Sequence, residues 1–313
     1  MPLDFIQDIR KEVLRWLPFD RSDPVVMTAI NNMGTAELLT RYFNWLQRLV
    51  HQHPRTVFKS QEFSSQAFTR EQEIDLSRIV QKIENGEDLT PHLSKRIRSG
   101  FDLVNNSTSV NRLNRRSDLD LLLNDWGIHH LHISNQVEND GFVMRTGSLL
   151  FSIFTQDKSF LVEVFPEHGE WTDQRLVEIA VRNWPAENLF IRLEGVVGLE
   201  NPISSSDRAQ LRSAGIDSFI EVDGGVYSSR TMGLSSAGTS SVATTKAHRL
   251  LRYLESVKIS FQENPDFLRL EFERLGVSYP SEPIFQIIFA RNDTGWGFVL
   301  QEEISQTIFS IPY

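Results

Sequence analysis

The apolar residues of this chain change their spacing near Gly127, and that change constrains the fold more than any other feature. Before Gly127 they recur every three or four residues, which predicts helices over residues 3–17, 36–52, 70–84 and 91–97. After Gly127 the period changes to about two residues, which predicts strands over 128–133, 148–155 and 160–165 joined as an antiparallel meander. We therefore predict an α+β fold, with a helical N-terminal domain followed by an antiparallel-sheet domain with flanking helices.

Further elements are expected on both sides of the meander. Helical spacing favours helices over 118–126, 173–183, 206–213 and 242–257, and a turn at 223–225 favours a hairpin over 219–227. Apolar stretches predict strands over 267–272, 284–289 and 296–300. The polar segment 104–117 is the expected boundary, giving a helical domain over 1–116, an α+β domain over 117–260 and a β-rich extension over 261–313 that packs on the second domain.

The 313-residue chain contains no cysteine, which excludes disulfides, thiolate nucleophiles, cysteine zinc sites and iron–sulfur clusters. It has no apolar run near the roughly 18 residues that a membrane-spanning helix needs. The first twenty residues are amphipathic and carry both charges, which is not typical of a signal peptide. We therefore expect a cytoplasmic protein without a membrane partner.

The formal net charge of −9 is unevenly distributed. Segment 41–116 holds 13 Lys and Arg against 8 Asp and Glu, a local charge of +5 that leaves −14 on the rest of the chain. This asymmetry indicates an anionic partner such as RNA on the 41–116 face, with Arg48 and Arg55 as candidate binding residues. Docking of a protein partner or of a second copy is the alternative, in which the aromatic residues of the segment pack in the core.

Three of the eight histidines fall within four residues, at 129, 130 and 132. Because side chains alternate along a strand, His130 and His132 share one face, and His168 and Arg145 lie near the ends of the neighbouring strands. Acid–base catalysis by the histidines, with Arg145 as the cation for a phosphodiester, is one interpretation and needs no cofactor.

Two other interpretations of this cluster stay open. His130, His132 and His168 could bind a divalent transition metal together with a carboxylate such as Glu138 or Glu170. Alternatively, all of these histidines are structural.

Two weaker patterns involve anion binding. The loop 233–241 precedes a predicted helix, so Thr239, Ser240 and Lys246 are candidate phosphate ligands, although the loop matches no Walker motif and could simply cap the helix. Four residues separate Arg48 from His53, a spacing that resembles the active sites of HEPN-type ribonucleases.

Residues 117–185 resemble the compact core of RelE/ParE-type toxins and other small metal-independent ribonucleases. The resemblance rests on the order helix, strand, strand, strand, helix, together with His130, His132, Arg145 and His168. It implies an RNA-cleaving effector of a toxin–antitoxin or phage-defence system. The pair His130 and His132 is also similar to the cupin metal motif, but the next acidic residue, Glu138, lies six positions on and the second cupin motif is missing.

Overall fold

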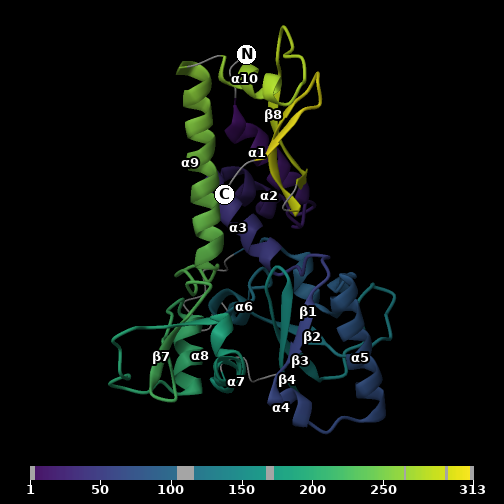
Figure 1. The fold of residues 1–313 in the computed structure, drawn as a ribbon, viewed down its shortest axis with the longest axis vertical. Helices are drawn as coiled ribbons and strands as arrows, with labels where there is room; N and C mark the ends of the chain where they lie inside the picture. The colour runs from purple at the N-terminus through teal and green to yellow at the C-terminus, as the bar shows by residue number, and fades with distance from the viewer. Residues whose placement is uncertain (1–3, 104–115, 167–172, 264–265, 293–294, 311–313) are drawn as a thin grey trace. The chain divides into compact units, whose positions relative to one another are not determined.

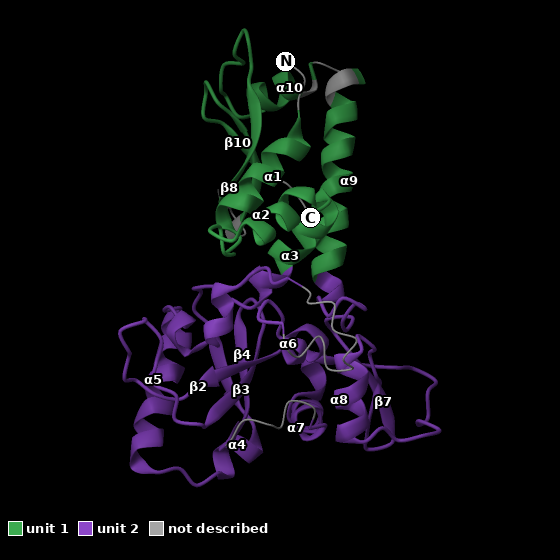
Figure 2. Cartoon of the chain, turned by 180° about the vertical axis from the view of Figure 1, so that it is seen from behind, with its two compact units in different colours: residues 1–43, 243–313 green, residues 44–242 purple. Residues whose placement is uncertain are grey.

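The computed structural model describes residues 4–103, 116–166, 173–263, 266–292 and 295–310, and it has the predicted mixed α+β architecture (Figure 1). The chain forms two compact units, one from residues 1–43 and 243–313 and one from residues 44–242 (Figure 2). These units have other boundaries than the three predicted domains. Residues 104–115 of the predicted linker lie outside the described part of the chain.

The first unit combines both ends of the chain. Its elements are α1 (Phe5–Trp16), α2 (Pro24–Asn32), most of α3 (Thr35–Gln47) and of α9 (Ser241–Glu263), α10 (Phe267–Arg274), β8 (Phe285–Asn292), β9 (Gly295–Glu302) and β10 (Ile308–Ser310). The strands form an antiparallel sheet in the order β10-β9-β8. The ring of Tyr42 lies 5.6 Å from that of Phe298 and 5.8 Å from that of Phe289. These aromatic contacts join the N-terminal helices to the C-terminal sheet.

The strand predicted over 267–272 is wrong, because this segment is helix α10. Leu268 and Phe272 are both buried and lie four residues apart, which places them on one side of a helix. The ring of Phe272 contacts those of Tyr279 and Phe285 at 5.1 and 6.4 Å. In the sequence, the apolar Leu270 between the two buried residues gives the segment the alternation of a strand.

The second unit contains the predicted meander. Its elements are β1 (Thr56–Lys59), α4 (Gln61–Ser65), α5 (Arg70–Asn85), the 3-10 helices η1 (Thr90–His92), η2 (Lys95–Arg98) and η3 (Pro185–Glu187), α6 (Leu121–Trp126), β2 (Ile128–His132), β3 (Leu149–Phe154), β4 (Lys158–Phe165), α7 (Arg175–Asn183), β5 (Phe190–Arg192), α8 (Ser205–Ser213), β6 (Ile220–Val222) and β7 (Gly225–Ser229). The meander is confirmed as β2, β3 and β4, which pair antiparallel. The strand β1 joins them parallel to β4, and the full order is β1-β4-β3-β2.

The four-stranded sheet is covered on both faces. Buried residues of α7, such as Leu176, pack with Ile128 of β2 and Phe151 of β3, and we call this side the α7 face. Buried residues of α5, such as Ile79, pack with Leu131 of β2, and we call this side the α5 face. Because successive residues of a strand point to opposite faces, this division fixes the direction of every side chain on β2.

Side chains extend the hydrogen-bond ladder of β4 beyond the end of β1. The Ser60 hydroxyl donates to the carbonyl of Val162 at 2.5 Å and also caps α4 by accepting from Phe63 N. The Gln66 amide then donates to the carbonyl of Val164 at 2.8 Å and accepts from its N–H at 3.0 Å. The backbone groups of Val162 and Val164 that lie beyond β1 therefore have partners, and α4 is held against this strand.

Candidate functional site

The histidines of β2 divide between the two faces as the alternation predicts. His130 and His132 lie on the α7 face with Ile128, and their ring centroids are 6.1 Å apart. His129 lies on the α5 face, where its Nε2 is 3.2 Å from the carbonyl of Gln47 and its ring meets Phe154 edge-on. Burial lowers the pKa of His129 to about 4, so this ring stays neutral at pH 7.

The carboxylate of Asp120, which was not predicted from the sequence, lies beside the histidine pair. Asp120 caps helix α6 by accepting from Leu123 N at 3.1 Å through Oδ1. Its Oδ2 lies 3.5 Å from Nδ1 of His130. A carboxylate at this position favours the tautomer with the proton on Nδ1, which leaves Nε2 able to accept a proton. The side chains of His130 and Asp120 keep 10% and 18% of their surface exposed.

The main chain at His132 is held by another histidine, His92 of η1. His92 is fully buried, and its Nδ1 lies 3.0 Å from the carbonyl oxygen of His132. Its Nε2 lies 3.1 Å from Nζ of Lys82 on α5. Burial, with a smaller contribution from the charge of Lys82, lowers the pKa of His92 to about 4. A neutral His92 therefore donates to His132 and accepts from Lys82.

Arg145 does not join the histidine pair. Its Nη2 donates to the carbonyl of Leu93 at 3.1 Å, and its guanidinium lies 5.6 Å from the ring centroid of Phe142. Both neighbours belong to the apolar cluster of the α5 face, whereas His130 and His132 point to the α7 face. Burial lowers the pKa of Arg145. His168 lies outside the described residues.

The two arginines expected to bind a ligand are buried and bound to main-chain carbonyls. Arg48 donates to Ser99 at 2.7 Å and to Ser117 at 3.3 Å. Arg55 donates to Thr155 at 2.9 Å and also to two carbonyls of the preceding loop. Burial lowers the pKa of both. Their hydrogen bonds hold loops to the core, and His53, the partner of Arg48 in the HEPN-like spacing, is exposed.

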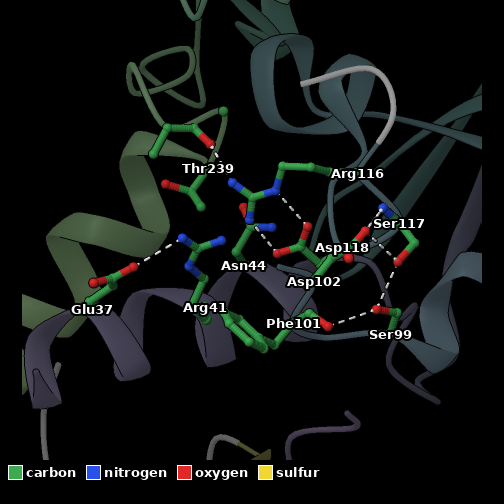
Figure 3. Close-up of polar contacts among 12 residues, drawn as sticks. Glu37, Arg41, Asn44, Ser99, Phe101, Asp102, Arg116, Ser117, Asp118 and Thr239 are labelled. Carbon is green, nitrogen blue, oxygen red and sulfur yellow. Dashed lines mark hydrogen bonds and ion pairs between the residues drawn. The ribbon is translucent and has the colours of Figure 1, made fainter. Parts of the chain in front are cut away.

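A polar network continues from Ser99 and Ser117. Figure 3 shows Arg116 and Asp118 facing each other beside Ser117 and Asp102. Arg116 and Asp118 form a buried ion pair at 2.5 Å, and Asp102 accepts from the backbone and the hydroxyl of Ser117. The network fastens the segment that leads into α6, and so it fixes the position of Asp120.

Some of the basic residues of segment 41–116 are not available to a partner in the described part of the chain. Four of the 13 are buried, namely Arg41, Arg48, Arg55 and Arg116. Lys95 lies 3.0 Å from Glu138 and 2.6 Å from Asp140, which neutralise it. Arg112 and Arg115 lie outside the described residues. These buried or paired basic residues therefore make their contacts within the protein.

The backbone N–H groups and hydroxyls of loop 233–241 form hydrogen bonds within the protein. Leu234 N donates to Asp217 at 2.8 Å, and Ser240 N donates to Asn44 at 2.9 Å. The Ser240 hydroxyl accepts from Val242 N at 3.2 Å, and the Thr239 hydroxyl lies 2.9 Å from that of Ser235. Thr239 and Ser240 are buried, so the loop has the geometry of a helix cap. Lys246 belongs to the other compact unit, and burial lowers its pKa.

Among the described residues, no three His, Asp or Glu side chains gather in a group that could hold a metal ion. In the same part of the chain, no helix combines the length and apolar character needed to cross a membrane. Comparison of the chain with protein-family models, with curated proteins and with solved structures found no match.

Proposed function

We propose that His130 and His132 are the acid–base pair of a phosphodiesterase that acts on RNA. The observation that carries this proposal is the placement of two imidazoles on one strand face, 6.1 Å apart, with the Asp120 carboxylate 3.5 Å from Nδ1 of His130. Two groups at this separation can serve the attacking and the leaving oxygen of one phosphodiester. The resemblance of residues 117–185 to RelE/ParE-type toxins supports a cytoplasmic role in a toxin–antitoxin or phage-defence system.

The two histidines have different roles in the proposed step. Nε2 of His130 takes the proton of the ribose 2′-hydroxyl, and the 2′-oxygen attacks phosphorus. His132, in its protonated form, gives its proton to the departing 5′-oxygen as the P–O5′ bond breaks. The products are a 2′,3′-cyclic phosphate and a free 5′-hydroxyl, and no cofactor is consumed. Asp120 stabilises the positive charge that develops on His130.

The test is cleavage of RNA by the purified chain and by three variants, His130→Ala, His132→Ala and the double change. We expect each single change to lower the cleavage rate by about 100-fold or more, with cyclic phosphate termini in the wild-type products. The exposed His53 supplies a matched control, since His53→Ala should leave the rate unchanged. Full cleavage by a folded double variant would refute the proposal, and thermal unfolding of each variant establishes that it is folded.

A second candidate is a binding module without catalytic activity. It is favoured by the low exposure of the pair, since His130 keeps 10% of its side-chain surface and His132 only 5% of its residue surface. The placement of Arg145 on the opposite face also favours it. RNA binding by the wild-type chain without any cleavage would select this candidate.

A further inference from the structure

An open groove lies between α4, β4 and α7 in the second unit. Its volume is about 390 Å³, and polar side chains line it, namely Gln61, Glu62, Ser65, Gln66, Glu163 and Arg175. None of these residues is part of the histidine pair.

A buried carboxylate holds the arginine of this groove in place. Arg175 donates to Glu163 through Nε at 2.7 Å and through Nη2 at 2.6 Å, and the Glu163 side chain is only 7% exposed. This bidentate pair fixes the plane of the guanidinium. The Arg175 side chain is 53% exposed, and its Nη1 makes no hydrogen bond to a described residue. The groove thus presents a positioned donor.

The opposite side of the groove presents an acceptor. Oε2 of Glu62 accepts from Nδ2 of Asn183 at 2.8 Å, and Asn183 in turn accepts from the backbone of Gln61 at 2.8 Å. These bonds tie α4 to the end of α7. Oε1 of Glu62 accepts no hydrogen bond from the part of the chain that the structure describes. Donor and acceptor therefore line the same groove, on side chains that protein contacts already orient.

The strand register places this groove and the histidine pair on the same side of the sheet. His130 of β2 is paired with Phe151 of β3, and Phe151 is paired with Glu163 of β4. Paired residues of neighbouring strands project to the same face, so His130 and Glu163 both lie on the α7 face. Two strand spacings separate them by about 10 Å. The buried side chain of Phe151 lies between them, so an RNA strand that occupies both sites has to pass over the protein surface.

We propose that the groove binds the base of a nucleotide in the RNA strand whose phosphodiester is held at His130 and His132. A nucleobase edge offers a hydrogen-bond acceptor beside an N–H donor, which complements Nη1 of Arg175 and Oε1 of Glu62. The lining carries two carboxylates and one guanidinium, a balance that disfavours a free phosphate as the ligand. The inference rests on the proposed ribonuclease function and names the part of its substrate that the second site would recognise.

The test measures binding separately from cleavage. The probe is a fluorescein-labelled single-stranded RNA of mixed sequence in which every ribose carries a 2′-O-methyl group, so that it cannot be cleaved by the proposed route. Fluorescence anisotropy then gives its Kd for the full chain. Arg175→Lys keeps a cation opposite Glu163 but loses the free Nη1 donor, and Glu62→Gln loses the carboxylate. We expect each variant to bind about tenfold more weakly.

Arg182 is the matched control, because it lies on the same helix, is 48% exposed and pairs with Asp223. Arg182→Lys should bind the probe like the wild type. Equal binding by the Arg175 and Glu62 variants, or no binding by the wild-type chain, overturns the groove as a nucleotide site. Binding that depends on Arg175 in a chain that cleaves no RNA would retain the groove and reject the nuclease. RNA cleavage that neither Arg175→Lys nor Glu62→Gln affects would retain the nuclease and reject the groove.

Discussion

Nδ1 of His92 lies 3.0 Å from the main-chain oxygen of His132. A carbonyl only accepts, so the proton of the neutral imidazole is on Nδ1 and Nε2 receives the hydrogen bond from Lys82, 3.1 Å away. The contact satisfies a backbone group on β2, which is an edge strand of its sheet. A buried neutral histidine thus anchors the strand that carries the proposed catalytic pair.

Stability should fall as the pH falls from about 6.5 to about 4, because His92 has a pKa of about 4 in the folded chain against 6.5 ordinarily. The unfolded chain binds a proton in this window and the folded chain does not. The contribution of His92 is complete above pH 6.5, and its loss amounts to about 3 kcal/mol. His129, whose pKa is also lowered to about 4, acts in the same direction. Urea unfolding between pH 7 and pH 4.5 measures the effect.

The variant His92→Gln identifies the group responsible. Gln can still donate to the carbonyl of His132 but does not titrate, so the free energy of unfolding should depend less steeply on pH. His53→Gln, a change of an exposed ring, should leave the pH dependence as it is. An unaltered slope in the His92 variant would show that this ring does not carry the effect.

Asp120→Asn should separate catalysis from stability. Asn is as good an N-cap as Asp, so the cap of α6 is retained, and Asp118 still offsets the charge of the buried Arg48. The change removes the negative charge beside His130, and we expect RNA cleavage to slow by about 100-fold or more. Asp120→Ala should in addition lower the free energy of unfolding by about 1 kcal/mol. Wild-type cleavage by the Asn variant would remove Asp120 from the mechanism.

The change of apolar spacing at Gly127 was enough to predict β2, β3 and β4, and the alternation of side chains along β2 was enough to place His130 and His132 on one face. The strand β1 was not predictable in this way, because it spans only four residues and pairs with β4 about a hundred positions later, as in Thr56 opposite Lys158. Its place in the sheet is set by long-range pairing and not by local pattern.

The conformation of the loops decides which side chains lie beside His130 and His132. Asp120 reaches His130 because α6 ends at Gly127, which adopts φ +72° and sends the chain back along the helix as β2. Arg145 points away from the histidine pair because Phe142, in the same loop, packs into the α5 face. An Asp in the capping position before a short helix is a signal that could have singled out Asp120, but nothing local fixes the side taken by Arg145.

The ion pair between Asp125 of α6 and Arg212 of α8 should show strong coupling. The two groups are 2.7 Å apart and each side chain is 4% exposed, while the Arg212 guanidinium lies 4.4 Å from the ring centroid of Trp126. Removing one partner leaves the other as a buried, unpaired charge. Asp125→Asn and Arg212→Met should therefore each lower the free energy of unfolding by about 3 kcal/mol. The double variant should cost clearly less than the two single costs combined, as measured by a urea double-mutant cycle. Additive costs would mean that the two groups do not act as a pair.

Gly233→Ala tests whether loop 233–241 is a fixed part of the fold. Gly233 has φ +69°, and an added Cβ would lie 2.1 Å from Oδ2 of Asp217. Asp217 would have to move, and it would lose its hydrogen bond from Leu234 N. Gly141 also has a positive φ, of +83°, but its Cβ would meet nothing within 4 Å. We expect Gly141→Ala to lower the free energy of unfolding by about 1 kcal/mol because of its backbone conformation. Gly233→Ala should lower it by at least about twice that amount. Equal costs would indicate that Asp217 is free to withdraw, and the loop would then be adaptable enough to serve a ligand.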